Sequence, residues 1–167
     1  MNIIITVLRL VHIVSAVAWV GLALSFSAFI APAANAAGEA GLRFLKKLFE
    51  ATRFSVIFPV ASGLTMLMGI LLYVTGDPST SFSRTGQIVL GIGALAGLAA
   101  GIHGGAVLNR STKAYAASLA KYPDGQPIPA DGITALQAEA TQVNSHLQVS
   151  IWLVVIALIA MAGARYL

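Results

Sequence analysis

Four long apolar segments, each almost free of charged residues, constrain this chain more than any other feature. They cover about residues 3–31, 53–75, 86–109 and 146–165. At a rise of about 1.5 Å per residue, each can cross the roughly 30 Å hydrocarbon core of a bilayer. Because lipid offers no partners to backbone polar groups, such segments must be helical. The sequence therefore predicts an all-α integral membrane protein, an antiparallel bundle of four transmembrane helices forming a single domain over residues 1–167.

The composition narrows the classes of function. Only 10% of the residues are charged, against about 25% in soluble proteins, so a water-facing surface could not be covered. The absence of cysteine excludes disulfides, thiolate metal sites and iron–sulfur clusters. The net charge of +4 comes from basic residues beside the apolar segments, where they anchor helices to headgroups. The predicted partner is therefore the lipid bilayer, and nucleic acid is not expected.

The basic residues also predict an orientation. The side that holds the first and third connections carries Arg43, Lys46, Lys47, Arg53, Arg110, Lys113 and Lys121, whereas the other side carries only Arg9, Arg84 and Arg165. By the positive-inside rule, the richer side is cytoplasmic. We therefore expect a multi-pass protein of a bacterial-type inner membrane with both termini in the periplasm.

The connections carry further signals. In the first, Leu42, Leu45 and Phe49 share one face, which predicts an amphipathic segment that lies at the interface or extends the second helix. Residues 76–79 read Gly-Asp-Pro-Ser and predict a tight turn. Asp131 is a plausible N-cap. We expect the third and fourth helices to extend beyond the bilayer on the cytoplasmic side.

The third segment contains a ladder of glycines spaced four residues apart: Gly93, Gly97, Gly101 and Gly105. Stacked glycines form a smooth groove that lets a neighbouring backbone approach closely. The groove could serve packing within the bundle, a homodimer or docking on a larger membrane complex. It could equally leave room for a flat macrocycle, and glycine alone does not separate these interpretations.

The three histidines are the principal candidates for chemistry, because ionisable side chains are expensive inside a membrane. His103 lies near the cytoplasmic end of the third segment and His146 at that end of the fourth. Since these antiparallel helices follow one another directly, the two rings could face each other. Imidazole is the usual ligand of heme iron and also suits copper and zinc. The pair is therefore predicted to be an axial ligand set for heme b.

His146 also belongs to a polar stripe on one helix face, formed with Glu139, Gln142 and Ser150. Two interpretations of this stripe stay open. It could line a partly hydrated pocket inside the bundle, or it could simply lie among the lipid headgroups.

His12 lies nearer the opposite surface, with Arg9 one turn earlier and Trp19 on roughly the same face. One interpretation is an interfacial histidine with a tryptophan packed below it. The other is a second ligand site, or a site in which Arg9 neutralises a heme carboxylate. His12 together with Met66 or Met68 could alternatively bind copper.

The first helix also resembles that of a known superfamily. Residues 8–21 read Leu-Arg-Leu-Val-His-Ile-Val-Ser-Ala-Val-Ala-Trp-Val-Gly, similar to the L-H-I-x-x-x-x-x-W-x-G pattern of copper-resistance D-type proteins, bacterial urate-oxidising membrane proteins and HemJ-type protoporphyrinogen oxidases. A Pro-containing second segment followed by Ser62-Gly63-Leu64 adds to the likeness. The resemblance implies a four-helix bundle in which His12 contributes to a heme or copper site.

The leading hypothesis is a small inner-membrane heme-b protein, acting in electron transfer or as a subunit of a redox enzyme. Its ligands would be His103 and His146, with His12 as an alternative or second site. A copper-binding or copper-delivery protein is the second hypothesis. The third is a non-catalytic subunit or assembly factor that docks through the glycine ladder. The sequence leaves open whether the chain catalyses a reaction.

Overall fold

The computed structural model describes residues 3–76 and 82–167, and within these ranges the regular structure is helical throughout, without a strand. Four long helical segments are apolar enough to cross a membrane. The predicted all-α membrane bundle of four helices is therefore confirmed. Most of the turn expected at residues 76–79 lies outside the described residues.

The four segments differ in how they are built. The first is α1 (Ile3–Ser25), the π-helical turn η1 (Phe26–Ile30) and α2 (Ala31–Ala36). The second is α4 (Phe54–Thr75). The third joins α6 (Arg84–His103), the π-helical turn η2 (Gly104–Leu108) and α7 (Asn109–Ala120). The fourth is α8 (Ala130–Gly163), which ends in the 3₁₀ turn η3 (Ala164–Tyr166). Asp131 lies in the first turn of α8, after its N-cap Pro129.

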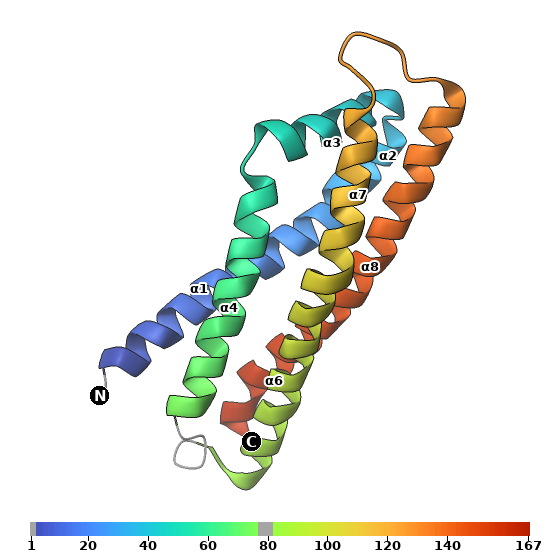
Figure 1. Cartoon of the computed structure of the whole chain (residues 1–167). Coiled ribbons are helices and arrows are strands. Elements are labelled where there is room, and N and C mark those ends of the chain that lie inside the picture. The colour runs from blue at the N-terminus through green and yellow to red at the C-terminus, as the bar shows by residue number, and fades with distance from the viewer. Residues whose placement is uncertain (1–2, 77–81) are drawn as a thin grey trace.

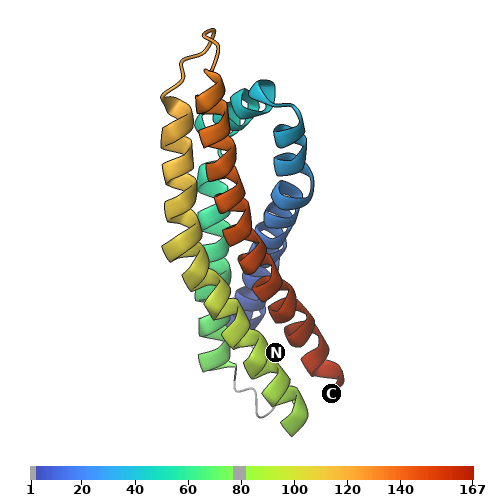
Figure 2. The ribbon, with the colours of Figure 1, turned by 90° about the vertical axis from the view of Figure 1, so that its right-hand side faces the viewer.

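The bundle consists of two closely packed helix pairs (Figures 1 and 2). Helix α1 packs along α4, and α6 packs along α8, while α4 meets α6 and α1 meets α8 over smaller areas. Both chain termini lie at one end of the bundle, and α3 and the α7–α8 connection lie at the other. Large apolar side chains such as Val14, Val17 and Leu95 remain exposed on the outer surface. That surface suits contact with lipid tails.

Helix α3 (Glu39–Ala51) is a separate amphipathic helix that lies across the end of the bundle (Figure 1). Its buried face contains Leu42, Leu45 and Phe49, and it is separated from α4 at Thr52 and Arg53. Of the two arrangements that the sequence allowed, the structure therefore has a distinct helix and not an extension of α4. Lys46, expected to reach the headgroups, is instead only 9% exposed.

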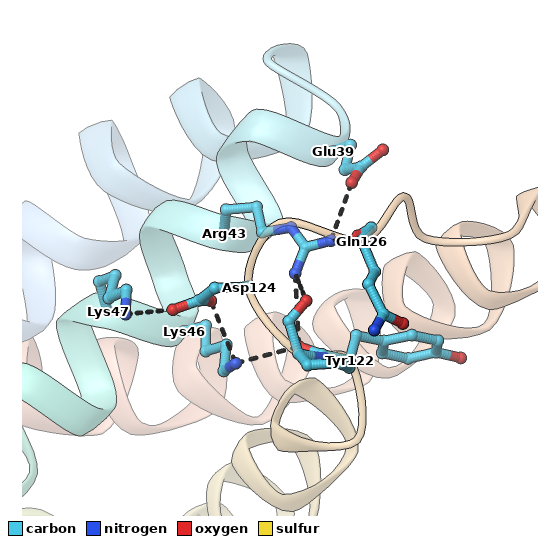
Figure 3. A network of polar contacts seen from close by, with 8 residues as sticks. Glu39, Arg43, Lys46, Lys47, Tyr122, Asp124 and Gln126 are labelled. Carbon is cyan, nitrogen blue, oxygen red and sulfur yellow. Dashed lines mark hydrogen bonds and ion pairs between the residues drawn. The ribbon is translucent and has the colours of Figure 1, made fainter.

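A polar clasp joins α3 to the α7–α8 connection (Figure 3). Lys46 Nζ donates to the Tyr122 carbonyl oxygen at 3.0 Å and to Asp124 Oδ1 at 3.2 Å, and Lys47 Nζ pairs with Asp124 Oδ2. Arg43 donates to the carbonyl oxygens of residues 122, 123 and 126 and to Glu39 Oε1. The clasp explains why Lys46 is buried, because its ammonium group finds oxygen partners inside the protein.

The clasp should depend on the charge of Asp124. Hydrogen bonds from Lys47 and then Lys46 hold the pKa of this carboxyl below its ordinary value of 3.8. Its ion pairs therefore contribute fully above that pH and are lost as the pH falls through the lowered pKa. We expect Asp124→Asn at neutral pH to speed hydrogen exchange in residues 121–129, with exposed Asp131→Asn as the control. Unchanged exchange in the Asp124 variant would contradict this role.

The glycine ladder faces different neighbours along its length. A Cβ at Gly93 would lie 2.9 Å from Met161 Cγ and 3.2 Å from the Ala157 carbonyl oxygen, both in α8. A Cβ at Gly101 would overlap the Met66 side chain of α4. At Gly105 nothing lies within 4 Å. Close packing inside the chain therefore accounts for the first part of the ladder, and docking of a partner through its last glycine stays a prediction.

We expect Gly93→Leu to lower the free energy of unfolding by about 1–3 kcal/mol, because the larger side chain must push α6 away from α8. Gly105→Leu is the control in the same long segment and should leave stability nearly unchanged, because nothing lies within 4 Å of its Cβ position. Thermal unfolding of both variants in detergent checks the pair. Equal effects would show that the close α6–α8 approach at Gly93 is not what limits stability.

Candidate functional site

His103 and His146 form a pair at the contact between the third and fourth segments. His103 ends α6, His146 lies in α8, and their ring centroids are 5.8 Å apart with planes tilted by 58°. His103 Nδ1 lies 2.9 Å from the hydroxyl of the buried Ser150, one turn along α8 from His146. Both rings are half-buried. The structure thus brings these two predicted ligand residues together, and we call them the histidine pair.

The backbone beside the pair is irregular. The π-helical turn η2 begins at Gly104, directly after His103. Such turns widen a helix locally and are frequent at functional sites. No heavy atom lies within 4 Å of the position that a Cβ would take at Gly104 or Gly105. Side chains of other elements therefore leave space at Gly104 and Gly105.

A groove of about 560 Å³ adjoins His146 between α7 and α8. Its wall combines ionisable and polar side chains with small apolar ones: Ala106, Val107, Arg110, Ser111, Ala114, Tyr115, Glu139, Gln142, Val143 and His146. We call it the polar groove. Glu139, Gln142 and His146 of the predicted stripe line it, while Ser150 contacts His103 instead. This arrangement favours the pocket interpretation of the stripe.

Two residues that line the polar groove each carry a buried side-chain polar atom without a hydrogen-bond partner within the described chain. Glu139 Oε1 accepts a hydrogen bond of 3.0 Å from Ser118, but Glu139 Oε2 has none. The hydroxyl of Tyr115, a residue only 2% exposed, has none either. An unsatisfied buried polar group typically destabilises a fold by about 1–3 kcal/mol. Two of them in one groove call for an explanation.

A polar contact that sequence reasoning missed lies on another face of α8. Ser27, buried in η1, accepts a hydrogen bond of 2.5 Å from Gln148 Nε2 and donates one of 3.4 Å to Asn144 Oδ1. Asn144 and Gln148 are visible in the sequence as polar residues two positions either side of His146. Their partner is not, because the π-helical turn that contains Ser27 gives no recognisable sequence signal.

His12 lies elsewhere, between α1 and α4. Its Nδ1 is 2.8 Å from the Thr65 carbonyl oxygen and therefore donates to it, so that Nε2 is the ring nitrogen outside this hydrogen bond. The ring also packs against Gly69, where a Cβ would lie 2.9 Å from Cε1. Thr65 Oγ1 donates to Ser15 Oγ at 3.0 Å beside it. His12 is thus held by a different helix pair from the one that holds His103 and His146.

The remaining predicted site residues have separate surroundings. Trp19 is buried with Ala61, Ala100 and Val154, one residue from each of the four long segments, at the centre of the bundle. Arg9 is exposed on the outer surface. Met66 points its sulfur toward Gly101 of α6. In the described part of the chain, no group of three or more His, Cys, Asp and Glu residues is placed to hold a metal ion.

Fold and site together define a multi-pass, all-helical membrane protein with a histidine pair beside a polar groove. No protein-family model, no curated protein and no solved structure matches the chain.

We expect Ser27→Ala to lower the free energy of unfolding by about 1–2 kcal/mol, because it removes the buried partner of Gln148. Ser145→Ala is the control, since that hydroxyl is exposed and bonds only to the Gln142 carbonyl oxygen within its own helix. Unfolding in detergent, monitored by circular dichroism, compares the two. A Ser27 variant as stable as the Ser145 variant would contradict a structural role for this contact.

Proposed function

We propose that the chain is an inner-membrane heme-b-binding protein, acting in electron transfer or as a subunit of a redox enzyme, with His103 and His146 as axial ligands. The observation that supports this most is a pair of imidazoles with ring centroids 5.8 Å apart, from two helices that pack together. Heme iron takes four nitrogens from its macrocycle and one or two from the protein, whereas a protein zinc site uses three or four protein ligands. A two-ligand site therefore matches heme in its donor set.

The surroundings of the pair fit this role. Metal–imidazole bonds of about 2.0–2.1 Å place two nitrogens on one ion within about 4 Å of each other, and the ring centroids of the pair lie 5.8 Å apart. Ser150 at His103 Nδ1 would orient that ring and leave Nε2 as the ligand atom. Arg110 of the polar groove is a partner for a heme propionate. A bound heme would supply one-electron redox chemistry.

Copper binding at the same pair is the second candidate. It is favoured by the packing around the rings, where Ala100, Leu108 and Leu147 of the two helices are all buried. A macrocycle between the rings must part α6 from α8, while a single ion requires only ring rotations. The Nε2 atom of His12 keeps a separate copper site open, although Met66 is directed to Gly101 of α6. A role as non-catalytic subunit or assembly factor that docks through the glycine ladder stays a third prediction.

We further propose that the end carrying α3 faces the cytoplasm, with both termini in the periplasm. Its support is the excess of basic residues at that end, among them Arg43, Lys46 and Lys47 of the clasp. The positive-inside rule places such an end on the cytoplasmic side. The histidine pair and the polar groove would then lie toward the cytoplasmic half of the bundle.

Optical spectra and metal content of the detergent-purified protein test the function. We expect a Soret band that shifts on reduction, that is lost or strongly altered in His103→Ala and His146→Ala, and that persists in His12→Ala. Circular dichroism confirms that all three variants are folded. Protein that shows no Soret band and takes up no hemin overturns the heme proposal. Stoichiometric copper that is lost in the same two variants would establish the second candidate instead.

A further inference from the structure

Arg110, which lines the polar groove, carries a charge that the rest of the chain leaves unbalanced. It is exposed, and it takes no part in the salt bridges among residues 3–76 and 82–167, all of which belong to the clasp. We propose that the groove binds an anionic phospholipid of the surrounding membrane. The lipid phosphodiester contacts the Arg110 guanidinium, and the acyl chains lie along the apolar surface next to it. Lipid binding does not depend on the heme or copper site proposed above.

Arg110 lies at the depth of a membrane where lipid phosphates are found. Between Arg84 and Arg110 the third segment contains no Asp, Glu, Lys or Arg. At 1.5 Å per residue, the helix from one arginine to the other rises by about 39 Å. A bilayer is about 40–45 Å thick with its polar layers, around a hydrocarbon core of about 30 Å. The two arginines therefore reach opposite headgroup layers.

The charges around Arg110 favour an anionic lipid. The charged side chains of α7 are Arg110 and Lys113, one turn apart and both exposed. A guanidinium binds phosphate oxygens through paired N–H donors. Glu139 also lines the groove, but its bond from Ser118 places it about 12 Å of helix rise beyond Arg110, and its second oxygen is buried. A zwitterionic headgroup would bring its ammonium toward Lys113, so the anionic lipid is preferred.

The groove has the shape and lining that a phospholipid needs. It lies between α7 and α8, which run side by side (Figures 1 and 2), and basic pockets between membrane helices bind anionic headgroups. Exposed Gln142 lines its polar side, where the side-chain amide can bond to headgroup hydroxyls. Val107 lines its apolar side, and one turn farther into the apolar part of the bundle Ile102 and Val149 are exposed. Acyl chains can follow these side chains into the bilayer.

Native mass spectrometry of the full chain, released from nanodiscs of equal parts phosphatidylglycerol and phosphatidylethanolamine, tests the site. We expect one retained phosphatidylglycerol, with a preference over phosphatidylethanolamine that falls about tenfold in Arg110→Gln, because charge-assisted hydrogen bonds are lost. Ala114→Phe, which fills the groove one turn from Arg110 without changing the charge, should lower retention as well. Arg84→Gln is the matched control, since Arg84 is exposed at the opposite headgroup layer.

Thermal unfolding in a neutral detergent gives a second measurement. Without lipid, Arg110→Gln should unfold at the wild-type temperature, because Arg110 forms no salt bridge with the described residues. Added dioctanoyl phosphatidylglycerol should raise the unfolding temperature of the wild type and of Arg84→Gln, but not that of Arg110→Gln. An equal rise in all three proteins overturns the proposal.

The remaining outcomes are equally decisive. Equal losses of retained lipid in Arg110→Gln and Arg84→Gln show attraction to surface charge alone and overturn the site, as does unchanged retention in both groove variants. Phosphatidylethanolamine retained as strongly as phosphatidylglycerol, or full displacement by soluble glycerol 3-phosphate, overturns the assignment to an anionic lipid. A guanidinium has five N–H donors, so a lipid phosphate and the heme propionate proposed above can share Arg110. The Soret band and the metal content report on the histidine pair independently of lipid retention.

Discussion

Polar groups that must find partners away from water hold this bundle together. Lipid tails are as apolar as the helix surfaces, so helix association in a membrane rests on close packing and on hydrogen bonds between helices. The contacts observed follow that requirement. His12 and Ser15 join α1 to α4 through Thr65, Ser27 joins the first segment to α8, and His103 bonds to Ser150 across α6 and α8. Small residues provide the close packing, as where a Cβ at Gly93 would lie 3.2 Å from the Ala157 carbonyl oxygen.

Helix α3 packs against one residue of the polar groove, Tyr115. Phe49 of α3 meets the ring of Tyr115 edge-on, with centroids 6.3 Å apart. The ring of Phe49 also packs against those of Phe26 and Phe54. The clasp fixes α3 against the connection that joins α7 to α8, the two helices that form the groove. The ring of Tyr115 is therefore positioned by α7, which carries it, and by the ring of Phe49, which packs against it.

Much of the fold follows from the sequence, because hydrocarbon allows so few alternatives. Segment length and low charge were enough for the four helices, and the apolar face of α3 was visible as Leu42, Leu45 and Phe49. The polar contacts between different helices were harder to predict from the sequence. The burial of Lys46 depends on Asp124, far away in the chain, and the contact of Ser27 depends on a π-helical turn. Trp19 fills the centre of the bundle, where it packs with Ala61, Ala100 and Val154 from the other three segments.

The candidate site, too, was predictable from the sequence only in part. Adjacent antiparallel helices made the proximity of His103 and His146 foreseeable, whereas the separate environment of His12 required knowing which residue of α4 it meets. The unsatisfied atoms of Tyr115 and Glu139 could not be foreseen, since a sequence does not reveal which buried group lacks a partner. Among the described residues these are the buried side-chain polar atoms without a hydrogen-bond partner, a destabilising feature that packing does not require. Proteins retain features of this kind where function needs them, which is why the groove, and not only the histidine pair, defines the site.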